Sequence, residues 1–360
     1  MKNIVYIGQY NGIIGGIERY MQKSAEILRR NGFAVQCLYM EEGGRDQHIF
    51  SAAFDRIQHF SPESGFLKMA DLIILHNIID VKYLQILPRN KTYFFAHDHN
   101  IYCQRHHYYM PIGRINCHRT HNKWICRLCS LGWNPAPPLA EYRKFPALVL
   151  SEFIRGNLCK NGFEHVVKLP AFITCSEQEH IFLPDNELRI LFLGQLIRGK
   201  GADLMLKTLA KLDIPFRCTI AGEGKDRRIL ESMVEKYGLQ SKVFFTGFVS
   251  DPAELWSNSD VLFFPIRWQE PFGLVGLEAL AHGVPVISFD LGGVREYLSD
   301  VCGALIPEKN IKQATETLTQ FYRQPELLKT MGQNGLTLVK NQFSEKQFVE
   351  KFKELIGGLQ

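Results

Sequence analysis

Short apolar runs alternate with amphipathic stretches along most of this 360-residue chain. In the second half, the stretches between the runs place apolar residues three and four positions apart, as in helices with one buried face. The pattern predicts strands at residues 188–193, 216–221, 242–246, 260–264 and 284–288, and helices at residues 202–211, 226–237, 252–256 and 274–282. Apolar strands that alternate with helices form parallel sheets covered on both faces, so this half is expected to be a doubly wound α/β domain.

The first half repeats this rhythm more loosely. Its pattern predicts a helix at residues 16–31 and strands at residues 3–8, 33–39, 72–75, 92–95 and 147–150. We therefore expect two facing Rossmann-like domains, residues 1–170 and 171–341, with a C-terminal helix in residues 342–360 that packs back on the first domain. Ligands of such sheets bind beyond the carboxyl ends of the strands, so the interdomain cleft is the expected binding site.

The composition agrees with two packed domains. Apolar residues make up 46% of the chain and charged residues 22%, which excludes a disordered protein. No apolar run approaches the ~20 residues of a membrane-spanning helix. The first residues lack a signal-peptide core, so we expect a cytoplasmic protein.

Charge is unevenly distributed. Residues 1–175 contain 21 Lys and Arg against 13 Asp and Glu, whereas the remainder contains 21 against 24. A basic first domain suits an anionic partner, such as the inner face of the cytoplasmic membrane or a phosphorylated substrate; a solvated surface without a partner is the alternative. The net charge of +5 is too small to indicate nucleic-acid binding.

In each half of the chain, a glycine-rich loop follows the first strand. Gly15 and Gly16 open the first helix, where backbone N–H groups could approach a phosphate. In the second half, Arg198 and Lys200 stand on a glycine loop and could neutralise a diphosphate. The chain has no Asp-x-Asp motif for Mg²⁺, so we expect cations to hold the diphosphate and no cofactor to be required for the chemistry.

The most informative segment is residues 270–278. Glu270 stands before a predicted helix, whose first N–H groups, at Gly273, Leu274 and Val275, lack partners within the helix and can bind phosphate. Glu278 is a carboxylate on an otherwise apolar helix and needs a hydrogen-bonding partner, for which ribose hydroxyls are suitable. A buried structural network around Glu278 is the alternative.

At these residues the sequence resembles the family 4 retaining glycosyltransferases of the GT-B fold. The resemblance is carried by six motifs, in order: Gly15-Gly16-Ile17-Glu18, Gly194…Lys200-Gly201, Ala221-Gly222-Glu223-Gly224, Phe245-Thr246-Gly247-Phe248-Val249, the pair Glu270 and Glu278 separated by seven residues, and Gly283-Val284-Pro285 with Gly292-Gly293-Val294-Arg295-Glu296.

The resemblance implies a role for each matching residue. Glu270 would contact the donor sugar, and His97, after the strand at residues 92–95, would face that sugar as a second catalytic residue. The remaining donor-binding residues would be Gly15, Gly16, Arg198 and Lys200 at the diphosphate with Gly273, Leu274 and Val275, Val249 at the base, Glu278 at the ribose, and Phe272. The family commonly has Arg where this chain has Gln195, and Arg198 is the expected replacement.

The implied activity is transfer of a sugar, with retention, from a nucleoside-diphosphate sugar to a saccharide or lipid-linked acceptor. A UDP-sugar is favoured over a GDP-sugar, and the product would be a cell-surface glycan such as lipopolysaccharide, capsule or exopolysaccharide. Two alternatives stay open: a non-catalytic homologue that acts as a binding protein, and a sugar-nucleotide epimerase. A dehydrogenase is disfavoured because no G-x-G-x-x-G follows a first strand.

The irregular stretch at residues 97–142 holds four of the nine cysteines, Cys103, Cys117, Cys126 and Cys129. One Cys-x-x-Cys pair with two further thiols is a reasonable structural zinc site, and unliganded thiols are the alternative. Cations interleave with aromatic residues in the same stretch, so we interpret it as an acceptor-recognition insert.

Overall fold

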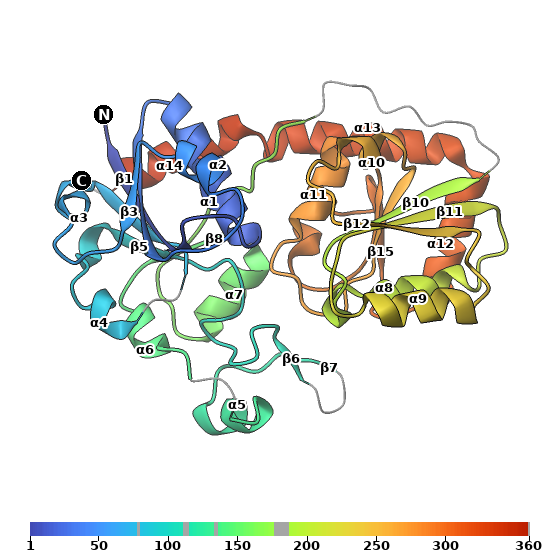
Figure 1. The fold of residues 1–360 in the computed structure, drawn as a ribbon, viewed down its shortest axis with the longest axis horizontal. Coiled ribbons are helices and arrows are strands. Elements are labelled where there is room, and N and C mark those ends of the chain that lie inside the picture. Colours follow the sequence, from blue (N-terminus) through green and yellow to red (C-terminus); the bar gives the residue numbers. More distant parts are fainter. Residues whose placement is uncertain (78–79, 111–114, 133–135, 176–186, 359–360) are drawn as a thin grey trace. The chain divides into compact units, whose positions relative to one another are not determined.

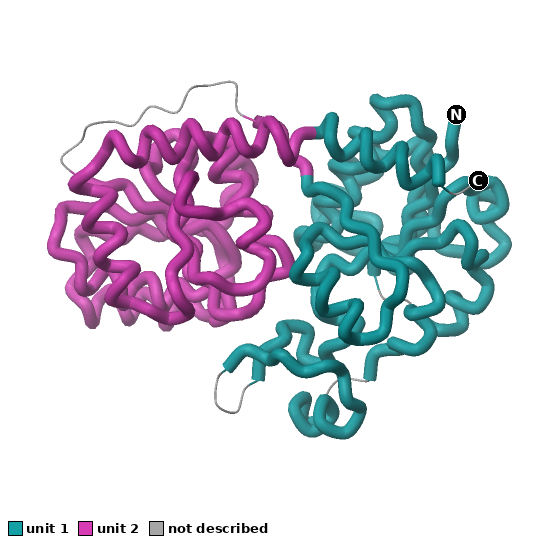
Figure 2. Tube along the Cα trace, turned by 180° about the vertical axis from the view of Figure 1, so that it is seen from behind, with its two compact units in different colours: residues 1–171, 345–360 teal, residues 172–344 magenta. Residues whose placement is uncertain are grey.

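The computed structural model describes residues 1–77, 80–110, 115–132, 136–175 and 187–358. The chain divides into two compact units (Figure 1, Figure 2). Unit 1 comprises residues 1–171 and 345–360, and unit 2 comprises residues 172–344. None of the helices within the described ranges is both long and apolar enough to cross a bilayer.

Unit 2 contains a six-stranded parallel sheet. Its strands lie in the order β12 (Val243–Gly247), β11 (Phe216–Ala221), β10 (Leu188–Leu193), β13 (Val261–Phe264), β14 (Val286–Phe289) and β15 (Gly303–Ile306). The chain starts in the middle of the sheet, builds outward to one edge, returns to the middle and builds to the other edge. This is the doubly wound Rossmann order, so the expected fold class is confirmed for this unit.

Helices cover both faces of the unit 2 sheet (Figure 1). They are α8 (Ala202–Leu209), α9 (Arg227–Lys236), α10 (Ala253–Ser257), α11 (Leu274–Ala281), α12 (Ile311–Arg323) and α13 (Pro325–Gln342). Helix α8 contacts α9 and α12, while α11 contacts α13. Helix α11 is apolar on nearly every side because it is buried between the sheet and α13.

Unit 1 repeats this architecture with seven parallel strands. Their order is β3 (Arg56–His59), β2 (Ala34–Glu41), β1 (Asn3–Tyr10), β4 (Leu72–Leu75), β5 (Thr92–Phe95), β8 (Ala147–Val149) and β9 (Val166–Lys168). Its α-helices are α1 (Gly16–Arg30), α2 (Gln47–Ala52), α3 (Gly65–Met69), α4 (Val81–Leu84), α5 (Lys123–Cys129), α6 (Leu139–Tyr142) and α7 (Glu152–Lys160), together with α14 (Glu345–Gly357) from the end of the chain.

Helix α14 packs on α1 within unit 1. The rings of Phe33 and Phe352 meet edge to face with centroids 5.7 Å apart, and Arg30 forms an ion pair of 3.0 Å with Glu345. Phe348 and Phe352 are buried, so apolar packing holds the final helix while the exposed ion pair adds little.

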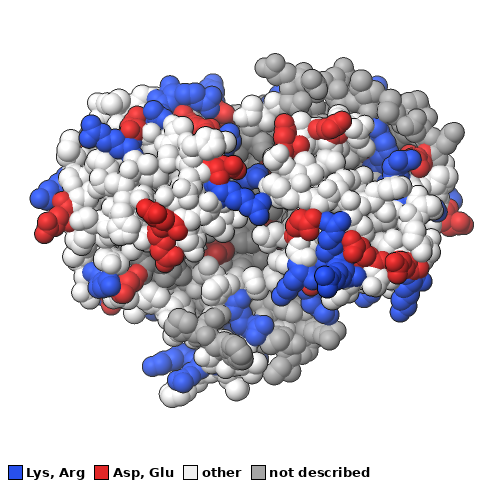
Figure 3. Space-filling view, viewed as in Figure 1, with Lys and Arg blue, Asp and Glu red and all other residues white. Residues whose placement is uncertain are grey.

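The irregular stretch of unit 1 forms the two-stranded hairpin β6 (Tyr109–Met110) and β7 (Ile115–Asn116), followed by α5 (Lys123–Cys129). Ile101, Tyr102 and Tyr108 belong to the hydrophobic core of unit 1, so this segment is anchored at its start. Charges are mixed on the face drawn in Figure 3, where Lys and Arg stand beside Asp and Glu on both units.

Candidate functional site

The strand order of unit 2 reverses between β10 and β13, which are neighbours in the sheet. The loop after β10 is residues 194–201, and the loop after β13 is residues 265–273. Both leave the carboxyl ends of their strands, and parallel α/β sheets bind ligands at such a reversal. Sheet topology therefore brings together the two loops that carry Lys200 and Glu270.

Lys200 and Glu270 form an ion pair. The Lys200 Nζ lies 2.8 Å from Oε2 and 3.0 Å from Oε1 of Glu270. The two side chains are 26% and 17% exposed, so the pair is shielded without being sealed from solvent. An arriving anion can therefore share the ammonium, and sugar hydroxyls can donate to the carboxylate.

Arg267 holds the Lys200 loop in place, a role that sequence reasoning missed. Its guanidinium donates to both carboxylate oxygens of Asp203, at 2.5 and 2.6 Å, and to the backbone oxygen of Arg198 at 3.2 Å. The Arg267 backbone N–H donates to the Gly199 oxygen at 2.8 Å. Arg267 is buried, so this network is shielded from competition by water.

Gly201 ends the loop in the left-handed region, with φ +76°. A Cβ at this position would lie 1.7 Å from the backbone oxygen of Pro265. The loops after β10 and β13 touch there, which explains why a glycine directly follows Lys200.

Glu270 is fixed through its backbone by the Gly292–Gly293 turn. The Gly293 N–H donates to the Glu270 carbonyl at 2.7 Å, and Gly292 pairs with Glu270 as an isolated parallel bridge. A Cβ at Gly292 would lie 2.1 Å from the Glu270 oxygen. The glycine pair at residues 292–293 thus positions Glu270. The sequence around these glycines gives no indication of this role.

Tyr297 lies beneath the first turn of α11. Its hydroxyl donates to the carbonyl of Gly273, the residue that caps this helix, at 2.8 Å. Burial raises the pKa of Tyr297 well above its usual value, and the negative charges of Glu270 and Glu278 raise it further. The two glutamates of the motif therefore lie near one phenol, on the loop before α11 and in its second turn.

The other predicted donor residues are distributed around this region. Phe272 is buried against Tyr297, Leu274 and Val275 are half-buried at the start of α11, and Val249 is half-buried after β12. Arg198 is exposed and lines a separate hollow of about 230 Å³ with Asp203 and Asp226. Gln195 is exposed. Lys200 is thus the predicted cation that the structure brings to Glu270, and Arg198 points to a different hollow.

In unit 1, Gly15 is the N-cap of α1 and Gly16 is its first residue. The Gly15 N–H donates to the buried carboxylate of Glu18 at 2.9 Å, so Glu18 caps the helix. A Cβ at Gly15 or Gly16 would meet no atom within 4 Å. Packing within unit 1 does not require glycine at these positions, and the space beside them is available to a ligand.

His97 follows β5 and stacks on Phe95 with ring centroids 4.2 Å apart. Its Nε2 lies 2.9 Å from Nδ1 of His76, which follows the neighbouring strand β4. Burial lowers the pKa of His97 to about 3 and that of His76 well below its usual value. Both imidazoles are neutral at pH 7, and one donates to the other.

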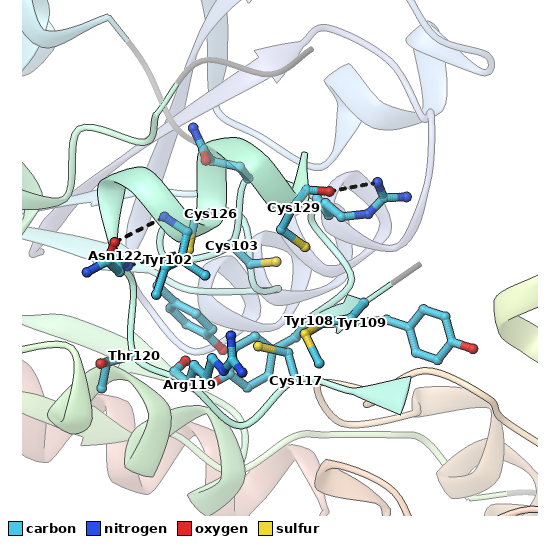
Figure 4. A pocket seen from close by; sticks show the side chains of 14 residues that line it. Tyr102, Cys103, Tyr108, Tyr109, Cys117, Arg119, Thr120, Asn122, Cys126 and Cys129 are labelled. Atoms are coloured by element: carbon cyan, nitrogen blue, oxygen red, sulfur yellow. Dashed lines mark hydrogen bonds between the residues drawn. The ribbon is translucent and has the colours of Figure 1, made fainter. Parts of the chain in front are cut away.

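The four cysteines of the irregular stretch line one pocket of about 320 Å³ (Figure 4). Among the residues with a described placement, no three His, Cys, Asp or Glu side chains converge to metal-binding distance. The predicted zinc site therefore stays a prediction. The cleft expected between the two domains also stays a prediction.

Comparison with known proteins places this geometry in a fold family. The Anabaena protein HepE in complex with UDP superposes with a TM-score of 0.76 at 16% identity, covering 99% of this chain and all of that one. The chain has the GT-B fold. Residues 176–337 of this GT-B chain match the family model described as glycosyl transferases group 1.

Two curated relatives are similar over part of the GT-B chain. An uncharacterized glycosyltransferase of Methanocaldococcus jannaschii is 36% identical over 135 residues, which is 36% of this chain and 34% of that protein. The lipopolysaccharide glucosyltransferase of Escherichia coli is 32% identical over 159 residues, or 42% of each protein. The chain therefore matches less than half the length of either relative.

Proposed function

We propose that this chain is a retaining glycosyltransferase that moves a sugar from a nucleoside-diphosphate sugar to a saccharide or lipid-linked acceptor. The observation that carries the proposal is the Lys200–Glu270 pair at the sheet reversal of unit 2, beside the N-terminus of α11. This pair combines a cation that can bind a diphosphate with a carboxylate that can accept hydrogen bonds from sugar hydroxyls. The family match over residues 176–337 supports this assignment.

In the proposed reaction, the bond between the anomeric carbon and the β-phosphate oxygen breaks, and the nucleoside diphosphate leaves with the bonding electrons. Lys200 and the first N–H groups of α11, at Gly273, Leu274 and Val275, stabilise the negative charge that grows on the phosphate. The acceptor oxygen bonds to the anomeric carbon from the same face. Its proton passes to the departing phosphate, and no metal is needed.

The remaining residues bind and orient the substrates. Glu270 accepts hydrogen bonds from the donor sugar, Glu278 from the ribose, and Val249 contacts the base. Arg198 is assigned to the outer edge of the nucleotide, because it lines a hollow apart from Lys200. Unit 1 supplies the open space beside Gly15 and Gly16 and the neutral imidazole of His97.

We favour a UDP-sugar as the donor and a cell-surface glycan as the product. HepE, which shares the fold, is described in complex with UDP, and one curated relative is a lipopolysaccharide glucosyltransferase. We further propose contact with the cytoplasmic face of the membrane through α5 and the segment that follows it. Trp124, Leu128 and Leu131 are 74%, 76% and 67% exposed beside the exposed cations Lys123 and Arg127, a combination suited to an anionic lipid surface.

The test is calorimetric titration of UDP and GDP, together with an NMR assay of nucleotide-sugar turnover. Lys200→Ala should weaken nucleotide diphosphate binding at least about tenfold, whereas Glu270→Ala should retain binding and lose turnover. Lys236→Ala and Glu254→Ala, at exposed positions of α9 and α10, are the matched controls. Equal loss of binding in both site variants would overturn the assigned roles, and wild-type binding without turnover of any sugar nucleotide would favour a non-catalytic binding protein.

A further inference from the structure

Helix α5 is held in place by little apolar packing. It has seven residues and no buried side chain, and Trp124 and Leu128 are largely exposed. Cys126 and Cys129 are its two half-buried residues, three positions apart on one face. A helix this short is marginal without a partner, and these two thiols are the groups of α5 that could attach it to the rest of unit 1.

Three separate parts of the irregular stretch bring four sulfurs to one pocket (Figure 4). Cys103 follows the buried Tyr102, and its N–H donates to the His99 oxygen at 2.8 Å. Cys117 follows β7, and its N–H donates to the Tyr108 oxygen at 2.8 Å. The first two thiols are therefore fixed to the core of unit 1, and the other two come from α5.

We propose that Cys103, Cys117, Cys126 and Cys129 bind one structural zinc ion that fastens α5 to unit 1. The described lining of this pocket contains no His, Asp or Glu, so the donor set is all thiolate. Four thiolates are a common ligand set of closed, tetrahedral zinc sites. Binding releases the four thiol protons and forms four zinc–sulfur bonds, with no change of oxidation state.

The polar groups around the sulfurs suit the negative charge of a zinc–thiolate site. Zinc with four thiolates carries a net charge of −2, and the lining includes the cations Arg105 and Arg119. Arg105 also donates to the carbonyl of Cys129, the last residue of α5, at 3.3 Å. The end of α5 therefore lies near this cation. The Asn122 N–H donates to the Cys126 sulfur at 3.4 Å, and amide donors of this kind support a metal-bound thiolate.

Among the described residues, no three of these sulfurs converge to metal-binding distance. Zinc–sulfur bonds are about 2.3 Å long, so the thiols must close around the metal. Cys126 and Cys129 are on the segment with no buried anchor, so we expect the closing movement to occur in α5. The ion would then fix the exposed face of Trp124 and Leu128 in a defined orientation.

The test is the metal content of the full chain purified under reducing conditions, measured by inductively coupled plasma mass spectrometry. Wild type and the control Cys159→Ser, which removes an exposed thiol of α7, should carry about one zinc per chain. The double variant Cys126→Ser/Cys129→Ser should lose at least about four-fifths of it.

A second measurement keeps the proposal testable if the double variant fails to fold. Wild-type chain is titrated with a mercurial reagent while a zinc-sensitive dye records release, which should be complete after about four thiols have reacted. Wild type free of metal after growth with added zinc would overturn the proposal. Iron with sulfide absorbance, or a disulfide between any two of these cysteines, would also overturn it.

Discussion

The ammonium of Lys200 lies 2.8 and 3.0 Å from the two carboxylate oxygens of Glu270, although the residues are 70 positions apart in the chain. They meet because β10 and β13 are neighbours in the sheet. Each neutralises the other in the ligand-free protein. In the function proposed above, a donor inserts its phosphate and sugar groups into this existing ion pair.

The pair predicts a coupling between the two residues. Lys200→Met and Glu270→Gln should each destabilise unit 2, because each leaves one half-buried charge without its partner. The double variant should be less destabilised than the sum of the two single variants by about 0.5–3 kcal/mol. Urea denaturation measures the three free energies of unfolding, and strict additivity would contradict the coupling.

Tyr297→Phe should lower the stability of unit 2 by about 1–2 kcal/mol. The change removes the hydroxyl that donates to the Gly273 carbonyl at 2.8 Å and leaves a buried oxygen without that donor. Because Gly273 caps α11, turnover should fall more than nucleotide affinity. Tyr237→Phe, at the C-terminal cap of α9, is the control and should leave stability, turnover and nucleotide affinity unchanged.

Gly201→Ala should be far more disruptive than Gly238→Ala. Both glycines have similar positive φ, +76° and +67°, so the backbone cost of alanine is comparable. At Gly201 the new Cβ would also overlap the Pro265 oxygen, whereas at Gly238 it would meet nothing within 4 Å. We expect about 1 kcal/mol at Gly238 and at least ~3 kcal/mol at Gly201 in thermal or urea denaturation. Equal losses would show that the two loops do not touch.

The paired histidines predict acid sensitivity in unit 1. The pKa of His97 is lowered to about 3 and that of His76 is also lowered, so the unfolded chain binds more protons than the folded chain below about pH 6.5. Stability is therefore present above that pH and is lost as the pH falls toward 3. Burial raises the pKa of Asp98 to about 6, so this carboxyl adds stability as the pH falls from about 6 to about 4. This opposes the effect of the histidines, but it comes from one group whereas the loss comes from two.

Thermal unfolding from pH 7 to 4.5 checks this prediction. His97→Gln should reduce the slope of stability against pH, whatever its effect on stability at pH 7. His165→Gln, outside the pair, is the control and should retain the wild-type slope. A wild-type midpoint that does not depend on pH would contradict the assignment of two neutral imidazoles.

Much of the fold could be predicted from local pattern. Strands 72–75, 92–95, 188–193 and 216–221 were predicted at their observed bounds, because each is an apolar run between turn residues. Strand β3 was missed because Arg56–His59 is a polar edge strand. No element was predicted between residue 289 and the C-terminal helix, where the structure has β15, α12 and α13. The strand Gly303–Ile306 has four residues, too few for a distinctive pattern, but the buried positions of α12 are spaced as in a helix and could have been recognised.

Some residues of the candidate site could likewise be predicted from the sequence, and others could not. Residue types and spacing pointed to Lys200, Glu270 and Glu278, because a cation on a glycine loop and carboxylates around an apolar helix need an explanation in any fold. Arg267 and Tyr297 could not be found, because each acts on a residue that is distant in sequence or on a backbone carbonyl. Arg198 and Lys200 are two positions apart, yet the tight turn of residues 198–200 sends their side chains to different places.

Local sequence was enough to predict the alternation of strands and helices, the two doubly wound domains and the residue types available for chemistry. These follow from periodicity and local composition, which act over a few residues. The folded chain was needed to reveal which loops meet at the sheet reversal of unit 2, that Lys200 pairs with Glu270, that His76 pairs with His97 and that four cysteines share one pocket. Those relationships depend on strand order and backbone contact between distant segments, and no short stretch of sequence encodes either.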